Sequence, residues 1–392
     1  MENKVSVWDL LQRSRNFGHA ALLISNNRLD KHSKYELIWG AGTKQIFSKP
    51  SELEGFRGWA LGRINYAFKS QKYFRVTQQK SSESNQGHFE FFEPEELVVV
   101  PSLQKNQVDY SRESIIESQI PIEFHCATTQ AKYLETVEQI KECIKNGVFY
   151  EMNYCIQYFT QLNIDPYDWF FRLNEAAPSP FAAFYKSNGM YTFCASPERF
   201  LQKTGGQLLS QPIKGTRKRN PQRDQEDREE LRNHIKDRAE NVMIVDLVRN
   251  DLSMVSKVGT VDVLELCEIY TFSHVHQMIS TVVSEVEVGI GFGDILEATF
   301  PMGSMTGAPK IEVMKHIDAL EDFTRTGYSG SLGYWHNGNF DLNVVIRGYE
   351  YSNNNLSYSV GGAITFDSIA QQEWDECQTK ASTVRSVYAS NL

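Results

Sequence analysis

Residues 327–368 read GYSGSLGYWHNGNFDLNVVIRGYEYSNNNLSYSVGGAITFDS, and this stretch decides the expected fold. Short apolar runs alternate in it with Asn- and Gly-rich turns, a pattern typical of consecutive strands. It predicts four of them, at 327–335, 340–349, 355–360 and around Ile364. An amphipathic helix is expected next, at 373–388.

The residues before this stretch mix helical and strand patterns. Residues 130–146 have helical periodicity, with Gly147 suited to the C-terminal cap, and residues 223–248 indicate one long helix. Shorter helices are expected around a Gly-rich turn, at 295–300 and 309–320. Further strands are expected at 20–25, 96–101, 154–162, 182–186, 190–195, 199–203, 262–269 and 277–286, a polar turn at 80–87 and a polar linker at 104–118. Strands clustered between long helices favour the α+β class.

Composition excludes several classes of protein. The chain has 392 residues, of which 41% are hydrophobic and 12% aromatic, far too many for a disordered chain. Its formal net charge of −9 gives no electrostatic footprint for nucleic acid or an anionic membrane. An anionic substrate must therefore be captured by local positive groups or by a metal.

Six cysteines are present, and none has the spacing of a zinc site or a C-x-x-C motif. We expect reduced, mostly buried thiols in a cytoplasmic protein. The N-terminal residues contain no apolar core of a signal peptide, and apolar runs such as 97–100 are far shorter than a membrane span.

Two acidic pairs lie on predicted helices, Asp237 with Glu240 and Glu373 with Glu376. Residues three apart face the same way on a helix, so each pair places like charges together unless a cation or solvent compensates. Such a set suits magnesium, which takes a few carboxylates and completes its shell with other oxygens. From spacing alone, a solvated helix face is the alternative interpretation.

Lys214 lies between Pro212 and Gly215, where a strand is expected to end. A lysine becomes a covalent nucleophile when its surroundings lower its pKa. From its local context alone, an ordinary surface lysine is the alternative.

Two further features suit anion binding. The turn PMGSMTGAPK at 301–310 opens a helix whose amides face outward, although its spacing is not that of a P-loop. Arg325, Tyr328 and Arg347 lie among glycines, before the pair Gly361-Gly362, an arrangement that suits carboxylate capture. A plain loop and salt-bridged arginines in a glycine-kinked sheet are the alternatives.

Taken together and in order, these motifs resemble the chorismate-utilising enzymes, which include anthranilate, aminodeoxychorismate, isochorismate and salicylate synthases. The resemblance covers about residues 128–388. It rests on SPERF at 196–200, PIKGT at 212–216, DRAENVMIVDLVRNDL at 237–252, the loop at 303–310, NVVIR at 343–347, GGAITFDS at 361–368 and EWDE at 373–376.

Position 214 separates the branches of this family. Anthranilate and isochorismate synthases typically carry alanine there, whereas aminodeoxychorismate synthases carry lysine, as this chain does. The resemblance thus implies amination of chorismate through a covalent adduct on Lys214.

The resemblance also implies a fold: one large domain, a two-sheet β-sandwich flanked by helices, with the site between the sheets. Residues 1–120 should contribute to that sandwich, and residues 121–392 should form the chorismate-binding catalytic region.

Roles for individual residues follow from the same resemblance. Mg²⁺ is expected on Glu240 and Glu376 directly, with Glu373 and Asp237 supporting it through water. Lys214 should attack C2 of chorismate while Glu198, its pKa raised, protonates the departing 4-hydroxyl. The substrate-binding residues are expected to be Thr306, Gly307, Tyr328, Arg347, Gly361 and Ala363.

Ammonia, supplied by a separate glutamine amidotransferase subunit, should then add at C4 and expel Lys214. A free lysine has a pKa of about 10.4, and we expect magnesium and Arg347 to lower that of Lys214.

Three alternatives stay open: anthranilate synthase component I, a salicylate or isochorismate synthase that adds water, and a catalytically silent regulatory partner that binds chorismate. All four acidic positions and Lys214 are present, which argues against a silent site.

Overall fold

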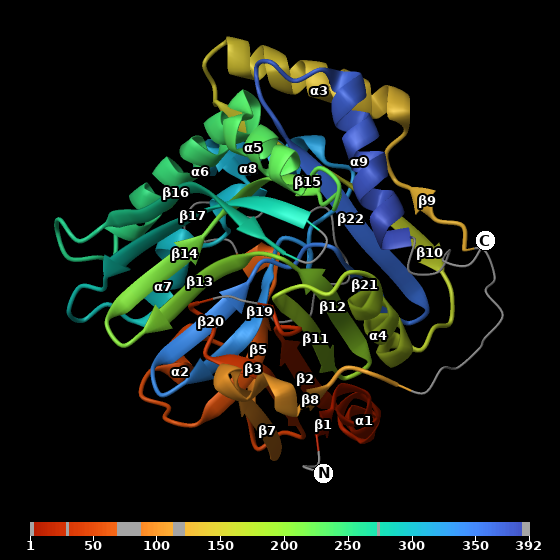
Figure 1. Cartoon of the computed structure of the whole chain (residues 1–392), viewed down its shortest axis with the longest axis vertical. Coiled ribbons are helices and arrows are strands. Elements are labelled where there is room, and N and C mark those ends of the chain that lie inside the picture. The colour runs from red at the N-terminus through yellow and green to blue at the C-terminus, as the bar shows by residue number, and fades with distance from the viewer. Residues whose placement is uncertain (1–3, 29–30, 69–87, 113–121, 273–274, 386–392) are drawn as a thin grey trace.

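The computed structural model describes residues 4–28, 31–68, 88–112, 122–272 and 275–385. Two ten-stranded antiparallel sheets form its centre, and helices flank them (Figure 1). The expected α+β sandwich is therefore confirmed.

The first sheet contains strands from all parts of the chain. Its order is β18 (Gly307–Ala308), β10 (Glu151–Gln161), β22 (Asn355–Ile364), β21 (Gly348–Ser352), β12 (Met190–Ser196), β11 (Phe181–Ser187), β2 (His19–Ile24), β3 (Tyr35–Ala41) and β7 (Glu96–Pro101), with β9 (His125–Cys126) also paired to β10.

The second sheet is built in the same way. Its order is β15 (Ile213–Lys218), β17 (Val275–Glu285), β14 (Gln207–Gln211), β13 (Arg199–Thr204), β20 (Asn339–Asn343), β19 (Ser331–His336), β5 (Trp59–Ile64), β6 (Phe89–Glu93) and β4 (Gln45–Phe47), with β16 (Asp262–Thr271) paired to β17. A separate parallel pair joins β1 (Val5–Ser6) to β8 (Val108–Asp109).

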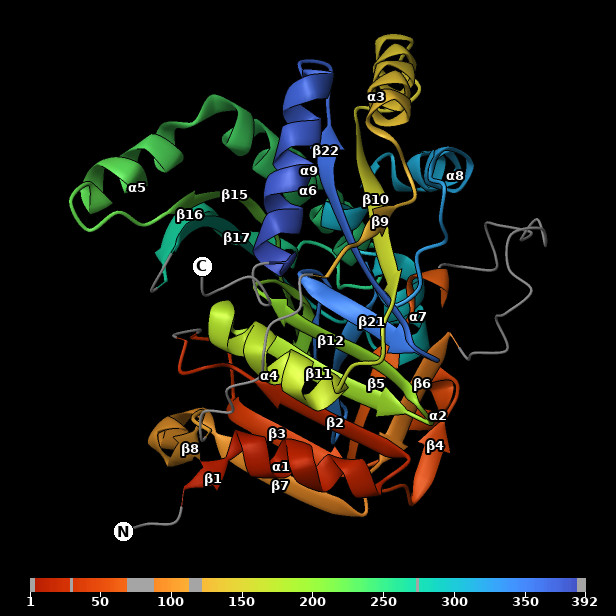
Figure 2. The same cartoon turned by 90° about the vertical axis from the view of Figure 1, so that its right-hand side faces the viewer.

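Helices cover the outer faces of the sheets. They are α1 (Val7–Arg13), α2 (Pro50–Leu53), α3 (Gln130–Lys145), α4 (Pro166–Ala176), α5 (Asp224–Asn233), α6 (Ile235–Ser253), α7 (Phe292–Thr299), α8 (Lys310–Leu320) and α9 (Ala370–Arg385), with the short 3-10 turns η1 (Ser14–Asn16), η2 (Tyr66–Phe68), η3 (Ser102–Gln107) and η4 (Gly303–Met305). Figure 2 shows α1 and α4 alongside β2, β11 and β12, and α9 beside β22.

Apolar side chains fill the space between the sheets and both outer layers. Between the sheets, Ala21, Ile38 and Tyr185 of the first pack against Leu61 and Phe92 of the second. Because β2 and β3 join the first sheet while β5 and β6 join the second, N-terminal strands line both sides of this interior. Separate cores lie under α1, α3, α4, α8 and α9, and under α6 and α7.

The helix expected at 223–248 is wrong as a single element, because the chain bends at His234. His234 has extended backbone angles (φ −70°, ψ 112°), and its ring accepts a hydrogen bond from the backbone N–H of Asp237. It thus caps α6 and separates it from α5. The bend lets the apolar residues of α6, among them Ile244 and Val245, face the core beside β17.

The single strand expected at 340–349 is also wrong. β20 ends at Asn343 in the second sheet, and β21 begins at Gly348 in the first. The residues between them cross the interior, and Arg347 adopts a positive φ of 54° to turn the chain. Conversely, the strands expected at 355–360 and around Ile364 are one continuous strand, β22.

The remaining expectations about local structure are confirmed or concern residues outside the described ranges. Helix α3 ends at Lys145, and Gly147 follows with φ 74° as its cap requires. The expected linker at 104–118 begins as η3 and β8, and the polar turn at 80–87 lies outside the described residues. All six cysteines lie within the described chain, and none forms a disulfide. Within the described residues, every helix is too short or too polar to span a membrane.

Candidate active site

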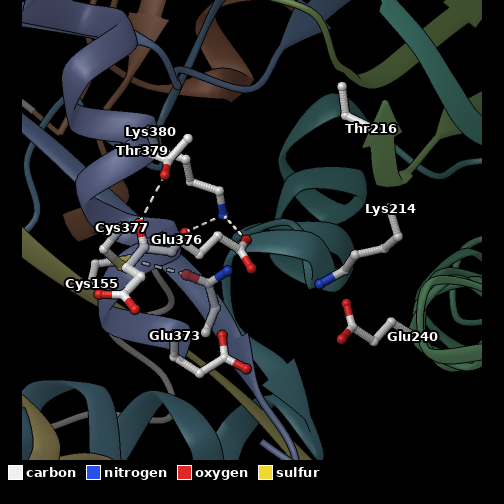
Figure 3. A network of polar contacts seen from close by, with 12 residues as sticks. Cys155, Lys214, Thr216, Glu240, Glu373, Glu376, Cys377, Thr379 and Lys380 are labelled. Carbon is white, nitrogen blue, oxygen red and sulfur yellow. Dashed lines mark hydrogen bonds and ion pairs between the residues drawn. The ribbon is translucent and has the colours of Figure 1, made fainter. Parts of the chain in front are cut away.

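Residues from both sheets meet beside α6 and α9. Lys214 lies near the start of β15 in the second sheet, and Glu151 is the first residue of β10 in the first. Glu240 comes from α6, and Glu373 and Glu376 come from α9. Figure 3 shows Lys214 and Glu240 on one side, pointing toward the carboxylates of α9 on the other.

The Lys214 amine is buried in an ion pair. Its Nζ donates a hydrogen bond to Oε1 of Glu151 over 3.0 Å. Burial lowers the pKa of Lys214, but the carboxylates of Glu151, Glu240 and Glu198 outweigh it, so that the pKa is raised overall. That magnesium and Arg347 together lower this pKa stays a prediction; without the cation, negative groups dominate around the amine.

Glu198 follows β12 in the turn to β13 and is only 5% exposed. Its Oε1 accepts a hydrogen bond from Ser304 Oγ over 2.7 Å. Burial raises the pKa of Glu198 to about 7, although Ser304, Lys214 and Arg347 oppose the shift. The direction agrees with the raised pKa expected for Glu198, and a carboxyl of this kind titrates near neutral pH.

Arg347 places a cation near Glu198 at the crossing between the two sheets. Its carbonyl accepts a hydrogen bond from the Ala195 N–H over 3.0 Å, which fixes the unusual backbone. Burial lowers the pKa of Arg347, and Glu198 opposes that change. Within the described residues, the guanidinium makes no hydrogen bond or ion pair, so its donors are available to a bound anion.

Carboxylates of α6 and α9 gather around the ammonium of Lys236. Its Nζ lies 3.0 Å from Glu373 Oε1 and 3.7 Å from Glu240 Oε1. Burial raises the pKa of Glu240 to about 7, which shows that its charge is poorly compensated. Glu376 pairs with Lys380 at 2.7 Å, and this lysine is the main reason why its pKa is lowered.

These carboxylates fit a magnesium ion held by few protein ligands. Lys236 shows that a positive charge is accommodated between the two helices, and Lys214 and Lys236 together do not offset the effect of burial on the pKa of Glu240. Among the described residues, no three acidic, histidine or cysteine side chains are arranged as a metal shell. Magnesium tolerates such a sparse set, since it keeps waters and takes substrate oxygens.

Asp237, the fourth acidic residue, has contacts of its own. Its Oδ2 lies 3.2 Å from the Arg217 guanidinium and 2.9 Å from the His234 ring. In the described residues, no contact joins it to Glu373 or Glu376. Its expected supporting role therefore stays a prediction.

The glycines of β22 lie beside the α9 carboxylates. A Cβ at Gly362 would meet Glu373 Oε2 at 3.4 Å and Glu376 Oε1 at 3.9 Å. A Cβ at Gly361 would clash with Cys155 Sγ at 2.3 Å, so only glycine fits there. β21 pairs with β22 only over residues 355–357, and the other strand partner of β22 is β10. One edge of β22, near Ala363, therefore has no strand partner in the described chain, although the Gly361 carbonyl accepts a hydrogen bond from Lys380 Nζ over 2.7 Å.

The remaining predicted binding residues have contacts within the protein. The Tyr328 hydroxyl lies 3.5 Å from Cys155 Sγ, next to Gly361. The buried Thr306 hydroxyl donates to the Met302 carbonyl over 3.1 Å and is occupied within its own turn. Gly307 has φ 149°, and a Cβ there would lie 2.1 Å from the Glu151 carbonyl oxygen. Gly307 thus lets β18 approach β10.

Arg325 is a structural residue and does not face the site as a free cation. Its guanidinium donates to both carboxylate oxygens of Glu321, at 2.5 and 2.9 Å, and to the carbonyls of Met305 and Asn153. Both partners of this ion pair are buried. Arg325 therefore joins the Gly-rich turn to β10.

Three contributing residues were missed from the sequence: Glu151, Ser304 and Lys236. Ser304 lay inside the anion-binding turn already singled out, and Lys236 lay one residue before Asp237. Glu151 was hidden because it lies before the strand expected at 154–162, whereas β10 begins at Glu151 itself. An acidic residue at a buried strand position is the signal that identifies it.

The fold and this site define an α+β enzyme scaffold with buried carboxylates, a buried lysine and an arginine available for anions. The family described as chorismate binding enzyme matches residues 28–386. The chain belongs to this family of chorismate-binding enzymes.

Curated relatives resemble about two thirds of the chain. The chain is 37% identical over 259 residues to aminodeoxychorismate synthase component 1 of Salmonella typhimurium, and 36% identical over 261 residues to that of Bacillus subtilis. These matches cover 65% and 66% of this chain, and 57% and 56% of the relatives. The chain thus spans a little more than half the length of these relatives.

Solved structures share the fold. Anthranilate synthase component I from Streptococcus pneumoniae superposes with a TM-score of 0.71 at 25% identity, covering 88% of this chain and 82% of that one. The menaquinone-specific isochorismate synthase from Escherichia coli gives 0.78 at 15% identity, covering 97% and 91%.

Arg325→Ala tests the structural role of the buried ion pair. It would leave Glu321 charged and buried without its partner, so we expect the free energy of unfolding to fall by about 3–5 kcal/mol. Urea unfolding measures this loss. A loss below about 0.5 kcal/mol would contradict the assignment.

Proposed function

We propose that this protein aminates chorismate to 4-amino-4-deoxychorismate, the precursor of p-aminobenzoate and folate. The observation that carries the proposal is the buried Lys214 amine, which lies among the site carboxylates. The names of the curated relatives, aminodeoxychorismate synthase component 1, support the same reaction.

In this mechanism Lys214 acts as a covalent nucleophile. Its neutral amine forms a bond to C2 of chorismate, both conjugated ring double bonds shift by one position, and the C4–O bond breaks. Glu198 gives its proton to the departing hydroxyl, which leaves as water. Ammonia then forms a bond at C4, both double bonds shift back, and the C2–N bond to Lys214 breaks.

Binding groups hold the substrate during these steps. Arg347 offers its guanidinium to a carboxylate, and the backbone N–H groups of Gly361 and Ala363, on the strand β22 that lacks a second partner here, are proposed to do the same. Tyr328, Thr306 and Gly307 shape the wall beside them. Excluding water around Lys214 protects the adduct from hydrolysis.

Glu240 and Glu376 would hold Mg²⁺, with Glu373 and Asp237 in support. A bound magnesium supplies positive charge that withdraws electrons from the ring through a substrate carboxylate. The designation component 1 of the relatives implies a second component, and we propose that a glutamine amidotransferase supplies the ammonia. A cytoplasmic location would suit the reduced thiols.

Anthranilate synthase component I is the second candidate, because a solved structure of that enzyme superposes on 88% of this chain. In that reaction ammonia would add at C2, and Lys214 would have no covalent role. The buried Lys214 favours amination at C4 instead.

The products distinguish these candidates. Incubated with chorismate, magnesium and an ammonium salt, the protein should form 4-amino-4-deoxychorismate, identified by mass spectrometry and by comparison with an authentic standard. Anthranilate as the product would establish the second candidate. Isochorismate or salicylate formed without ammonia would contradict both.

Removal of a metal carboxylate should abolish magnesium-dependent turnover. In Glu240→Gln or Glu376→Gln, the remaining carboxylates bind the cation too weakly, and we expect a loss of about 100-fold or more at saturating chorismate. Titration with magnesium chloride measures the change. Wild-type turnover and magnesium dependence in both variants would refute this assignment, and Glu138→Gln on exposed α3 serves as a control.

Activity should fall as pH rises through the pKa of Glu198. The acid must be protonated, and its pKa of about 7 means that the protonated fraction declines above neutral pH. We expect kcat to fall on this alkaline limb, and Glu198→Gln to lower kcat by about 10²–10⁴. A pH profile of kcat tests this. A fully active Glu198→Gln variant with the wild-type profile would disprove the role.

A further inference from the structure

Glu151 is a buried carboxylate with one partner. It is 1% exposed at the start of β10, where Ala308 of β18 pairs with its backbone. Its Oε1 accepts the hydrogen bond from Lys214 Nζ. Its Oε2 is also buried and has no hydrogen-bond partner among the described residues. Half of this carboxylate is therefore unused by the fold.

The proposed reaction requires a group that accepts a proton from Lys214. A lysine ammonium cannot attack carbon. The Lys214 side chain is only 10% exposed, so bulk water has little access to this amine. Glu198 is already hydrogen-bonded to Ser304 and has to donate a proton itself. No ion pair joins Lys214 to Glu240 in the described residues, whereas Glu151 lies within hydrogen-bonding distance. Geometry thus favours Glu151.

We propose that Glu151 is the base that converts the Lys214 ammonium into the nucleophilic amine. The Nζ–H bond breaks, its electron pair stays on nitrogen, and the proton binds a carboxylate oxygen of Glu151. Nζ then attacks C2. When ammonia displaces the enzyme, Glu151 returns the proton to the departing Lys214 amine. This inference rests on the covalent reaction proposed above.

The balance of charge supports this direct transfer. Before the transfer, Lys214 is an ammonium and Glu151 a carboxylate. After the transfer, Lys214 is an amine and Glu151 a carboxylic acid. The net charge of the pair is zero in both states, so the transfer creates no unpaired buried charge. Loss of the proton to water would instead leave Glu151 charged without its partner, which is strongly unfavourable.

Other charged groups face this pair without contacting Lys214. Their charges influence the free energy of the proton transfer. The nearest cations interact mainly with the carboxylates of this group and less with Lys214. These groups are Glu240 from α6, Glu198 from the turn after β12, Glu376 from α9, and the cations Lys236 and Arg347.

Glu151→Gln tests the base directly. The amide oxygen still accepts a hydrogen bond from Lys214, but it takes no proton. After rapid mixing with chorismate and magnesium without ammonia, we expect formation of the Lys214 adduct to slow by about 100-fold near neutral pH. Relative to wild type at the same pH, the rate should recover as pH rises toward about 10, because solvent then deprotonates the lysine while the loss of the Glu198 proton affects both proteins equally.

Two further variants separate a base from a structural residue. Glu151→Asp keeps a carboxylate, so its adduct formation should follow the wild-type pH profile even if the rate is lower. Glu36→Gln removes another buried carboxylate, far from Lys214 in the chain, and should leave the adduct rate unchanged. Thermal unfolding shows whether each variant is folded.

The outcomes are distinct. If wild-type protein forms neither an adduct nor 4-amino-4-deoxychorismate, the proposed function itself fails. If wild type forms the adduct and Glu151→Gln matches its rate and pH profile, only the role of Glu151 is overturned. An alkaline-shifted profile in folded Glu151→Asp would overturn it as well, and so keeps the test decisive should Glu151→Gln not fold.

Discussion

The ion pair between Lys214 and Glu151 joins the two sheets at the point where the chemistry is proposed. Lys214 belongs to the second sheet and Glu151 to the first, and 3.0 Å separates their charged atoms. Either group would be costly to bury alone, so each requires the other. The sandwich thereby holds an amine in a mostly buried site. A lysine there can react as a nucleophile only after it has lost its proton.

The surrounding groups follow from the same burial. Burial raises the pKa of both Glu198 and Glu240 to about 7, so that both carboxyl groups titrate near neutral pH. The chain crosses between sheets at Arg347 in a left-handed conformation that is rare for arginine. Such backbone strain persists where surrounding structure enforces it, and it commonly marks functional sites. One junction thus brings together a buried acid, an arginine available to anions and the proposed nucleophile.

Local patterns in the sequence identified much of the fold. Helix α3 was predictable because Tyr133, Val137 and Ile140 repeat at helical spacing and face the core. The break at His234 was missed because the residues on both sides favour helix, and the capping geometry appears only in three dimensions. The crossing between β20 and β21 was missed because both flanking segments have the pattern of a strand, while the change of sheet has no local signal.

For the site, the acidic pairs and Lys214 were visible as motifs, but the partner of Lys214 was not. Glu151 lies 63 positions away, and only the pairing of sheets brings it near. The pKa of Lys214 is raised overall, against the effect of burial, largely because of this same partner, Glu151.

Intact-protein mass spectrometry tests the central claim, a covalent lysine, most directly. Wild-type protein quenched with chorismate and magnesium but no ammonia should carry one chorismate-derived adduct, and peptide mapping should place it on Lys214. Lys214→Ala should show none and should lose 4-amino-4-deoxychorismate formation, and Lys214→Arg should not restore it because a guanidinium stays protonated. Absence of any adduct in the wild type, together with undiminished 4-amino-4-deoxychorismate formation by Lys214→Ala, would contradict the account.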